Sequence, residues 1–477
     1  MIIGAGPGGL CTAIRLLQAG IRDFVILEKA AGVGGTWWHN SYPGAECDVP
    51  SHLYSFSFEP KDDWVKPFST QPEIKAYLEH CVAKYGLTPH LRLETEVRSA
   101  GWEDPPGRWR IETTAGEVVH APIVVSAIGM FNEPHWANVP GLDRFEGTLF
   151  HSARWNHDHD LNGERVATIG SAASATQFVP EIAKQAGQLY VFQRSANWVL
   201  PKEDDPFDEE ALGAFRADAG LVSGSRQQIF EGLENLIQFD DQELIAKTGH
   251  VHKKFLGVVV DPEVRRKLTP RHPYGCKRPL LSNDYYPAFN RPNVELVTEG
   301  IAGITDDAIE TTDGKLRRVD TIVMATGFET TKYLSAIEVR GRDGLQLEDA
   351  WRDGAQAYLG ITTSGFPNLF MLYGPNTNNG SILFMLECQV DYVMRQLERM
   401  QARSVAWIDV RREVMDSYNE ALQRELDGVD VWHASCNGYY RGPSGRIVTQ
   451  WPRNMTIYRE RTQADDTDAY EMAPIDT

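Results

Sequence analysis

The chain opens with Met1-Ile2-Ile3-Gly4-Ala5-Gly6-Pro7-Gly8-Gly9, a short apolar run that enters a glycine-rich turn. Residues 10–19 have the composition of an apolar helix, and a second apolar run over residues 24–27 ends in Glu28. Strand, glycine-rich turn, helix and strand in this order are typical of a βαβ unit that binds a dinucleotide. This stretch therefore predicts an α/β fold built on a parallel sheet.

Three glycines of this turn have separate roles in the predicted unit. Gly4 permits the tight turn, Gly6 lets a pyrophosphate approach the backbone, and Gly9 lets the helix pack closely against the strand. Glu28 follows Gly4 by 24 residues, where a carboxylate can accept hydrogen bonds from a ribose 2′-OH. A glycine motif alone could be fortuitous, but the flanking strand, helix and acid favour a site for FAD or NAD.

A second unit of the same kind starts with Val166-Ala167-Thr168-Ile169-Gly170 and continues through a predicted helix to a strand at residues 189–192. Arg194 follows Gly170 by 24 residues, the same offset that separates the acid from the first glycine in the N-terminal unit. A cation there suits a 2′-phosphate through charge-assisted hydrogen bonds, which favours NADP. The alternative for Arg194 is a solvated charge at a strand end. We assign to this second cofactor Gly170, Ser171, Ser174, Arg194 and Ser195.

Length and charge limit the possible classes of protein. The 477 residues are about three times the ~150 residues of a typical domain, which predicts two or three fused units. Lys and Arg number 47 against 66 Asp and Glu, a net charge of −19, which argues against nucleic acid or an anionic membrane surface as a partner. No apolar stretch approaches the ~18–20 residues of a spanning helix, and no charged leader precedes the glycine turn. We therefore expect a cytoplasmic protein without a membrane span.

The six cysteines are scattered and form no Cys-x-x-Cys pattern. This spacing argues against a disulfide framework, a zinc site and a dithiol oxidoreductase. Two dinucleotide sites without a redox cysteine pair suggest that a nicotinamide passes a hydride to a flavin. The cofactors predicted on this basis are FAD at the N-terminal site and NADPH at the second.

We expect the chain to cross twice between two Rossmann-like domains. Residues 1–140 are predicted to form the first part of the FAD-binding domain, residues 141–315 the NADP-binding domain, and residues 316–463 the second part of the FAD-binding domain. Charged helices of mixed amphipathicity over residues 206–270 do not continue a parallel sheet, so they predict a helical insertion in the NADP-binding domain. Residues 464–477 are rich in Asp and Thr with few apolar side chains, which predicts a frayed tail.

Two longer patterns carry a resemblance to a known family. The linker pattern Phe-x-Gly-x-x-x-His-x-x-x-Trp, followed by Pro or Asp, is matched by Phe145, Gly147, His151 and Trp155, with Asn156 departing at the last position. The pattern Gly-Gly-x-Trp-(x)4-Tyr-Pro-Gly-(x)3-Asp is matched in full by Gly34, Gly35, Trp37, Tyr42, Pro43, Gly44 and Asp48. In these patterns the chain resembles the class B flavoprotein monooxygenases and, within them, the type I Baeyer–Villiger monooxygenases. The resemblance extends over residues 2 to about 458, and Trp155 favours this branch over related N- and S-oxidising enzymes, which carry Tyr or Phe there.

The resemblance implies an active site around Arg278, in the run Gly275-Cys276-Lys277-Arg278-Pro279. In the family this arginine stabilises the negative charge of a flavin C4a-peroxide, and the lysine that precedes it contacts the 2′-phosphate of NADP. Asp48 matches the family's active-site aspartate, which holds and tunes the arginine. A peroxyanion in a water-poor cavity needs a permanent cation with directional donors, and a guanidinium does not lose its proton. The alternative is an ordinary ion pair between Arg278 and Asp48.

Further residues are assigned to cofactor binding or to structure. Besides Asp48 and the glycines of the turn, the FAD site is assigned Gly35, Thr36, Trp37, Tyr54 and Val97. For Trp37 the alternative is a core aromatic. The family's late active-site tryptophan falls on Tyr439, in Cys436-Asn437-Gly438-Tyr439-Tyr440, with Trp432 as the alternative occupant. His151 lies in the family's domain-linking segment, so we interpret it as structural and not as a general base.

The resemblance implies an enzyme that uses NADPH and O2 to convert a ketone into an ester or lactone by way of a C4a-peroxyflavin anion. A second interpretation keeps both cofactors but oxygenates a soft sulfur or nitrogen, which needs the protonated hydroperoxide; Arg278 favours the anion. A third takes Ala172, Asn156 and Tyr439 as signs of decay, which leaves a flavin-binding partner protein. The sequence identifies neither the ketone nor the oligomeric state. Only three residues precede Gly4, which leaves open a start further upstream.

Overall fold

The computed structural model describes residues 1–433 and 438–475. Two five-stranded parallel sheets form the framework of the described chain. Each sheet contains a strand, a helix and a parallel strand in succession, as in a dinucleotide-binding βαβ unit. The predicted α/β class with two Rossmann-like cores is therefore confirmed.

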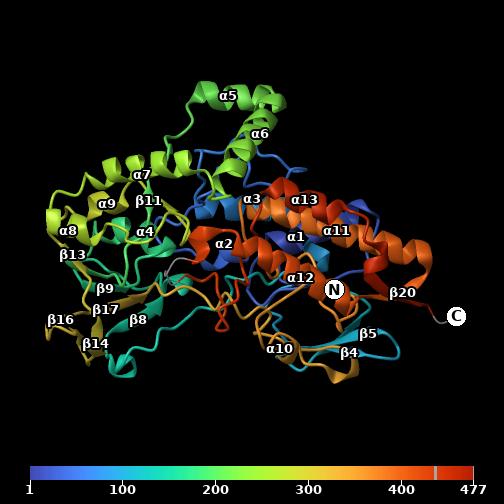
Figure 1. Cartoon of the computed structure of the whole chain (residues 1–477). Coiled ribbons are helices and arrows are strands. Elements are labelled where there is room, and N and C mark those ends of the chain that lie inside the picture. Colours follow the sequence, from blue (N-terminus) through green and yellow to red (C-terminus); the bar gives the residue numbers. More distant parts are fainter. Residues whose placement is uncertain (434–437, 476–477) are drawn as a thin grey trace.

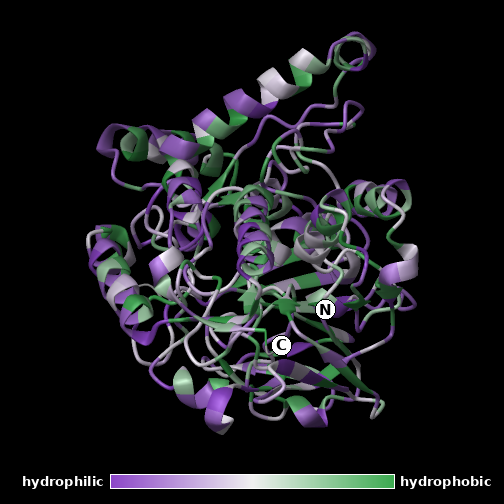
Figure 2. Ribbon diagram, turned by 90° about the vertical axis from the view of Figure 1, so that its right-hand side faces the viewer, coloured by the Kyte–Doolittle hydropathy of each residue, from purple (hydrophilic) through white to green (hydrophobic). Residues whose placement is uncertain are grey.

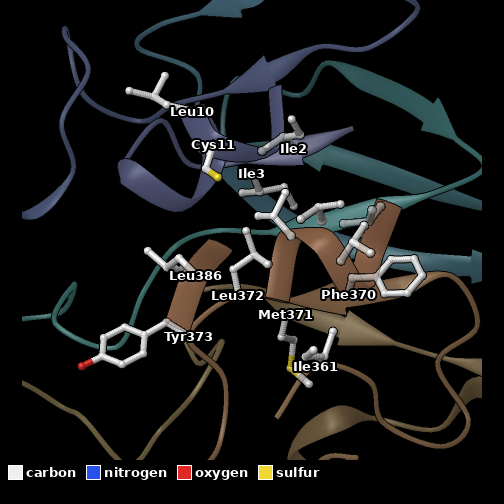
Figure 3. Packing of buried hydrophobic residues seen from close by; sticks show 14 of the residues in the cluster. Ile2, Ile3, Leu10, Cys11, Ile361, Phe370, Met371, Leu372, Tyr373 and Leu386 are labelled. Carbon is white, nitrogen blue, oxygen red and sulfur yellow. The ribbon is translucent and has the colours of Figure 1, made fainter. Parts of the chain in front are cut away.

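The first sheet joins early and late parts of the chain. Its strands are, in spatial order, β19 (Leu369–Met371), β7 (Val124–Ser126), β1 (Ile2–Ile3), β2 (Ile26–Leu27) and β3 (Leu91–Arg92). Helix α1 (Pro7–Gln18) follows β1 and packs against α11 (Ile382–Arg403). Apolar side chains from β1, α1, β19 and α11 meet in one core, part of which is drawn in Figure 3. This core fixes the glycine turn that leads from β1 into α1.

The second sheet lies beside the first in the fold. Its strands are, in spatial order, β13 (Val294–Val297), β10 (Gln188–Phe192), β9 (Arg165–Ile169), β17 (Thr321–Met324) and β8 (Thr148–His151). Helix α4 (Ala173–Ile182) follows β9, as α1 follows β1. In Figure 1 the strands β8, β9 and β17 lie on the left, and α1 and α11 of the first core lie on the right.

The second sheet continues beyond the predicted boundary at residue 315. Strand β17 pairs in parallel with both β8 and β9, and all four of its residues are buried, as expected for a central strand. The chain therefore returns to the first sheet only after Met324, and the boundary predicted at residues 315–316 is wrong by about one strand. A separate antiparallel sheet precedes β17 and interrupts the βαβ alternation by which the sequence could be divided; its strands are β14 (Ile301–Ile304), β15 (Ala308–Thr311) and β16 (Leu316–Arg318).

Residues 206–270 contain four helices: α5 (Glu209–Ala217), α6 (Ala219–Leu236), α7 (Gln242–Leu256) and α8 (Pro262–Lys267). An aspartate at the start of each accepts a hydrogen bond from a first-turn N–H, and these caps are Asp208, Asp218, Asp241 and Asp261. Helix α5 and the adjoining end of α6 project above the rest of the molecule in Figure 1, and Figure 2 shows the projection from the side. Arg226 anchors α6, because its Nη1 donates to the carbonyl oxygens of His52, Leu53 and Ser55 at 2.9–3.2 Å.

Smaller elements complete the fold. A mixed sheet contains β18 (Glu338–Arg340), β4 (Val97–Glu103), β5 (Arg108–Thr113) and β6 (Val118–Ala121). A two-stranded parallel ribbon joins β11 (Val199–Leu200) to β12 (Leu280–Leu281). The other helices include α2 (Thr36–His39), α3 (Gln71–Lys84), α9 (Tyr285–Ala288), α10 (Leu347–Ala350), α12 (Arg412–Asp427) and α13 (Met455–Gln463).

The C-terminal tail is ordered as far as the structure describes it, so the predicted frayed tail over residues 464–477 is wrong. Strand β21 (Tyr470–Pro474) pairs antiparallel with β20 (Val405–Val410). Asp466 is buried and accepts hydrogen bonds from the Tyr392 hydroxyl and, at 3.0 Å, from Arg399 Nη1. Tyr470 is buried as well. Strand pairing and a few buried polar anchors therefore hold a segment that offers few apolar side chains.

The described residues contain no helix that is long and apolar enough to cross a membrane. The same part of the chain has no cluster of three or more His, Cys, Asp or Glu side chains that could hold a metal ion. Its free cysteines are all buried: Cys11, Cys47, Cys81 and Cys388. Cys276 is disulfide-bonded, which the cysteine spacing did not predict. Cys436 and Asn437, which were included in the Tyr439 pattern, lie outside the described residues.

Candidate active site

A cavity lies at the carboxyl ends of the strands of the first sheet, the edge at which ligands of open parallel sheets bind. It is lined by residues that follow β1, β2 and β7, together with residues from the segment around α2 and from the start of β4. The residues predicted for FAD that line this one cavity are Gly4, Gly6, Glu28, Gly35, Thr36 and Val97. Residues that are far apart in the sequence thus meet at the predicted edge.

The glycine turn below this cavity has the close approaches that its sequence suggests. A Cβ atom on Gly4 would lie 2.7 Å from the carbonyl oxygen of Ala127, and one on Gly9 would lie 2.0 Å from the carbonyl oxygen of Gly4. Gly4 also has a φ of +102°, a conformation that favours glycine. Gly6 is the N-cap of α1 and supplies no side chain to the N–H groups of the first turn. Those N–H groups and the positive end of the helix dipole fit a pyrophosphate.

Glu28 has a structural role that the sequence did not predict. It is buried, its Oε2 accepts a hydrogen bond from the Ala5 N–H at 2.7 Å, and its Oε1 accepts one from the Ala30 N–H at 2.8 Å. The carboxylate therefore holds the glycine turn against the end of β2. Each carboxylate oxygen can accept more than one hydrogen bond, so a ribose hydroxyl fits beside these two contacts.

Asp48 and Arg278 form a bidentate ion pair. Arg278 Nη2 donates to Asp48 Oδ2 at 2.7 Å and to Oδ1 at 2.8 Å, and Nε donates to Oδ2 at 3.0 Å. The Asp48 charge raises the pKa of Arg278 well above its ordinary value, although burial acts in the opposite direction. The guanidinium therefore stays charged at neutral pH. Among the described residues Nη1 has no acceptor, so this nitrogen remains available as a donor.

Aromatic side chains lie close to this ion pair. Trp37 is buried, and its Nε1 donates to the Tyr54 hydroxyl at 3.1 Å. Burial raises the pKa of Tyr54, and the charges of Asp48 and Arg278 act on the same hydroxyl. After Asp48, the side chains that raise the pKa of Arg278 include Tyr439. The structure thus groups Trp37, Tyr54 and Tyr439 near the ion pair. Trp432 is buried in an apolar cluster with Ile237 and Trp451, and Tyr439 also packs against this cluster.

Tyr373 and Phe131 are site residues that the sequence analysis did not identify. Both line the first cavity, Tyr373 just after β19 and Phe131 in the segment that follows β7. Tyr373 belongs to the same buried cluster as Phe370 and Met371, and in Figure 3 its ring points to the side away from these two residues. Its hydroxyl donates to Asn378 Oδ1 at 2.6 Å. Their positions in the sequence could have identified them, because both residues follow buried strands, and such strands end at the ligand-binding edge of a parallel sheet.

A second candidate site lies where β9 leads into α4. Gly170 has a φ of +115°, and a Cβ atom there would lie 2.2 Å from the carbonyl oxygen of Ala325. Helix α4 begins after Ala172 without a side-chain cap, and Ser171 and Ser174 lie at this start. Ala172 and Ala175 stand where glycines are usual in such a motif, but the one glycine that the backbone geometry requires, Gly170, is present. The uncapped N–H groups of α4 fit a pyrophosphate for the same reason as those of α1.

Arg194, Ser195 and Lys277 are brought together beyond the end of β10. Lys277 Nζ donates to Ser195 Oγ at 2.6 Å. Burial lowers the pKa of Lys277, and the nearby charge of Arg194 lowers it further. In the described chain neither cation forms an ion pair with a carboxylate. Two neighbouring cations without a carboxylate partner fit a doubly charged 2′-phosphate.

The two long sequence patterns meet between the sheets. The Tyr42 hydroxyl donates to Gln177 Oε1 on α4 at 2.9 Å, and a Cβ atom on Gly44 would lie 2.7 Å from the carbonyl oxygen of Gln177. The Trp155 ring packs against Phe178 of the same helix, with 5.3 Å between ring centroids. These glycine and aromatic positions therefore dock the N-terminal loop and the linker on α4.

His151, another residue of the linker pattern, does not have the environment of a general base. Its side chain is buried at the end of β8, and its Nδ1 accepts a hydrogen bond from the Ala153 N–H at 3.1 Å. Burial, helped by the charge of Arg154, lowers its pKa to about 4. The ring is therefore neutral near pH 7 and held in place, which fits the structural interpretation.

Comparison with known proteins identifies relatives over nearly the whole chain. The family model described as pyridine nucleotide-disulphide oxidoreductase matches residues 1–207. A Baeyer-Villiger monooxygenase of Pseudomonas aeruginosa is 43% identical over 482 residues, which cover 99% of this chain and 90% of that protein. Among solved structures, an oxidized steroid monooxygenase bound to NADP has 33% identity and a TM-score of 0.88, with 99% of this chain and 98% of that chain covered. The complex of OTEMO with FAD and NADP has 27% identity and a TM-score of 0.90 over the same shares.

Proposed function

The chain belongs to the Baeyer–Villiger monooxygenase family, and we propose that it uses NADPH and O2 to convert a small-molecule ketone into an ester or lactone. It is an FAD-dependent monooxygenase in this assignment. The observation that carries the proposal is the bidentate pair of Asp48 and Arg278, which leaves one nitrogen of a permanent cation free to donate. Tyr373 lies near this pair and also lines the first cavity.

FAD fits the first cavity, and NADP fits the second site. Gly4, Gly6 and the N–H groups at the start of α1 would hold the FAD pyrophosphate, and Glu28 would accept from its ribose. Arg194, Ser195 and Lys277 would hold the 2′-phosphate of NADP. FAD bound here supplies hydride acceptance from the nicotinamide and activation of O2 for transfer of one oxygen atom.

Arg278 supplies the fixed positive charge that this transfer needs. Attack on a ketone carbonyl requires a negatively charged oxygen nucleophile, and a preorganised donor stabilises that charge without rearranging at the moment of reaction. Asp48 holds Nε and Nη2, so that Nη1 has a defined direction. No protein side chain needs to act as a nucleophile in this scheme. The protein orients the reactants and excludes water.

The proposal is tested by following oxygen atoms. Holoenzyme is supplied with NADPH, ¹⁸O2 and either a cyclic ketone or an aryl ketone, and the products are analysed by mass spectrometry. We expect an ester or lactone that carries one ¹⁸O atom, with consumption of one NADPH per product. Product without ¹⁸O, or NADPH consumption with hydrogen peroxide as the sole oxygen product, would contradict the assignment.

Oxygenation of sulfur or nitrogen is the alternative outcome of the same experiment. A thioether and a tertiary amine are therefore offered in parallel with the ketones. The permanent charge of Arg278 favours an anionic oxygen nucleophile, so we expect the ketones to be the better substrates. Sulfoxide or N-oxide formation without any ester would replace the proposed reaction with that alternative.

A further inference from the structure

The ribbon formed by β11 and β12 carries a cation at each of its ends. Arg278 lies two residues before β12, and Lys202 lies two residues after β11. Because the two strands run parallel, with Val199 opposite Leu280, the two cations stand at opposite ends of the ribbon. Lys202 is tied to the second strand as well, since its N–H donates to Asn283 Oδ1 at 3.0 Å and its carbonyl oxygen accepts from Asn283 Nδ2 at 2.9 Å.

The loop that faces this ribbon carries two matching acids. Glu46 and Asp48 lie two residues apart in the loop between α2 and α3. Asp48 binds Arg278 at one end of the ribbon, and Glu46 Oε1 accepts a hydrogen bond from Lys202 Nζ at the other. The loop is therefore attached to the ribbon at two points, one on each side of Cys47.

Lys66 and Asp204 complete a ring of four charged side chains with Glu46 and Lys202. Lys66 Nζ donates to Glu46 Oε2 and to Asp204 Oδ2, at 2.7 Å in both cases, and Lys202 Nζ lies 3.0 Å from Asp204 Oδ2. Positive and negative groups alternate around the ring, and its side chains are 4% to 18% exposed. Glu46 and Lys66 belong to the segment between α2 and α3, whereas Lys202 and Asp204 follow β11. Two ion pairs of the ring therefore cross between the same two parts of the chain.

The backbone of Glu46 is fixed independently of its side chain. Gln177 Nε2 on α4 donates to the Glu46 carbonyl oxygen at 2.9 Å, and Glu46 forms an isolated antiparallel bridge with Thr70. Lys202 also lies over the Phe68 ring, 4.9 Å from its centroid. The ring of four charged side chains is thus held in place both at Glu46 and at Lys202, and it does not consist of flexible surface side chains.

We propose that Glu46 and Lys202 are positioning residues that set the orientation of the Asp48 carboxylate and, through it, of Arg278. Backbone contacts hold Glu46 against α4 and Thr70, and its side-chain pair with Lys202 also ties this part of the loop to the ribbon. The loop and the ribbon are therefore joined on both sides of Cys47. Oxygen transfer depends on the orientation of Arg278, because a displacement of about 1 Å in a reacting geometry can cost on the order of 10²-fold in rate. The expected effect on oxygen transfer rests on the proposed function. The effect of Glu46 and Lys202 on the orientation of Arg278 does not.

The first test measures how oxygen transfer is coupled to NADPH use in the holoenzyme. Glu46→Gln and Lys202→Gln should lower the ratio of ester formed to NADPH consumed by roughly five- to tenfold and release the difference as hydrogen peroxide. The rate of flavin reduction by NADPH should change little. Lys202→Arg should restore most of the ratio, since it keeps the charge. The double variant Glu46→Gln with Lys202→Gln removes both charges together, so it remains informative if a single variant folds poorly.

A matched control separates positioning from general stability. Glu59 is another buried carboxylate that holds a lysine, with its Oε2 2.7 Å from Lys84 Nζ, but it lies away from the ribbon, beside α3. Glu59→Gln should lower stability and leave the ratio of ester to NADPH unchanged. An equal loss of that ratio in Glu59→Gln, or an unchanged ratio in folded Glu46→Gln and Lys202→Gln, would overturn the proposal.

The second test does not depend on catalysis. Phenylglyoxal reacts with arginine side chains, and modification of the Arg278 peptide can be timed by mass spectrometry. Loosening of the Asp48 pair should expose Arg278, so Glu46→Gln should raise this rate by roughly threefold or more, and Asp48→Ala should raise it further. An unchanged rate in Glu46→Gln would overturn the positioning role even if the parent forms ester. Conversely, a raised rate in a parent that forms no ester would support the positioning role and leave the proposed function as the part that failed.

Discussion

Asp48 and Arg278 are separated by 230 positions in the sequence, yet both oxygens of the carboxylate accept hydrogen bonds from the guanidinium. The shortest contact, between Nη2 and Oδ2, is 2.7 Å, and Nε lies 3.0 Å from the same oxygen. Two parallel donors fix the plane of the guanidinium as well as its position. The arginine therefore presents a charge with a defined direction.

Removal of Arg278 should separate flavin reduction from oxygen transfer. In Arg278→Ala, hydride transfer from NADPH should stay largely intact, because that step creates no oxygen-centred charge. Ester formation should fall by a factor of ~10² to 10³, the usual range for loss of one preorganised charge stabiliser. NADPH consumption, hydrogen peroxide and ester are measured separately with a cyclic or aryl ketone.

Two variants serve as controls for this prediction. Asp48→Ala should show a milder form of the same uncoupling, since Asp48 orients Arg278. Arg278→Lys keeps a positive charge but loses the fork of parallel donors, so it should recover only part of the ester. Ester formation at the parent rate in Arg278→Ala would show that Arg278 is only a structural partner of Asp48.

Arg194 should set the preference for NADPH. Charge-assisted contacts to a 2′-phosphate contribute on the order of 1.5–3 kcal/mol each, so Arg194→Ala should raise the KM for NADPH roughly tenfold or more. The KM for NADH should be nearly unchanged, because NADH has no phosphate at that position. Steady-state kinetics with both coenzymes check this, and an equal loss with both would show that Arg194 does not contact the phosphate.

Glu28 should control FAD content. Glu28→Arg places a cation beside the glycine turn and removes the acceptor of the Ala5 and Ala30 N–H groups, so we expect apoprotein. The ratio of FAD to protein is measured by absorbance, with circular dichroism as the check of folding. Glu28→Gln keeps one acceptor oxygen and should retain part of the FAD. Full yellow colour in Glu28→Arg would assign Glu28 to the turn alone.

The sequence predicted those parts of the site that depend on local chemistry. The spacing of Gly4, Gly9 and Glu28 reflects contacts within one βαβ unit, and these contacts are present in the structure. The pairing of Asp48 with Arg278 could be expected only from the resemblance to a family, because no periodicity relates residues so far apart. Tyr373 was missed because its direction depends on where β19 ends, and strand ends are poorly defined by composition.

The misassigned tail shows the same limit of sequence reasoning. Residues 464–477 have few apolar side chains, and composition alone therefore suggests disorder. The structure holds the segment by pairing β21 with β20 and by burying Asp466, contacts that require partners about 70 residues away in the sequence. The boundary near residue 315 failed for a related reason, since β17 is assigned by its neighbours β8 and β9 and not by its own residues.

Asp466 should therefore contribute to stability although it is remote from the site. It accepts hydrogen bonds from the Tyr392 hydroxyl and from Arg399, whose side chain is only 11% exposed. In Asp466→Ala the Tyr392 hydroxyl keeps Tyr470 and Arg399 Nη1 keeps Gln396 Oε1, but both lose their contact with the buried carboxylate, at a cost of about 1–3 kcal/mol. Thermal inactivation of the holoenzyme should shift to lower temperature, while the ratio of ester to NADPH stays that of the parent. An unchanged inactivation temperature would show that the tail does not support the fold.

Asp409 should make stability depend on pH below neutrality. Its side chain is buried on β20, accepts hydrogen bonds from the Gly365 N–H at 3.0 and 3.1 Å, and lies 3.8 Å from Arg342 Nη1. Burial raises its pKa to about 7, because desolvation outweighs the contacts with Gly365 and Arg342, and the Glu471 charge adds to the increase. In the unfolded chain an aspartate titrates near pH ~3.9.

The sign of the effect follows from these two pKa values. Between about pH 4 and pH 7 the folded protein keeps a proton on Asp409 that the unfolded chain has lost, so this group's contribution to the free energy of unfolding falls as the pH rises. The limiting slope is about 1.4 kcal/mol per pH unit, and the contribution is constant above pH 7. Asp409→Asn cannot titrate but keeps an acceptor for the Gly365 N–H, so its unfolding in denaturant should lack this slope. The stability of the variant relative to the parent should therefore increase from pH 4 to pH 7; a difference that stays constant with pH would mean that Asp409 is ionised in the folded protein throughout that range.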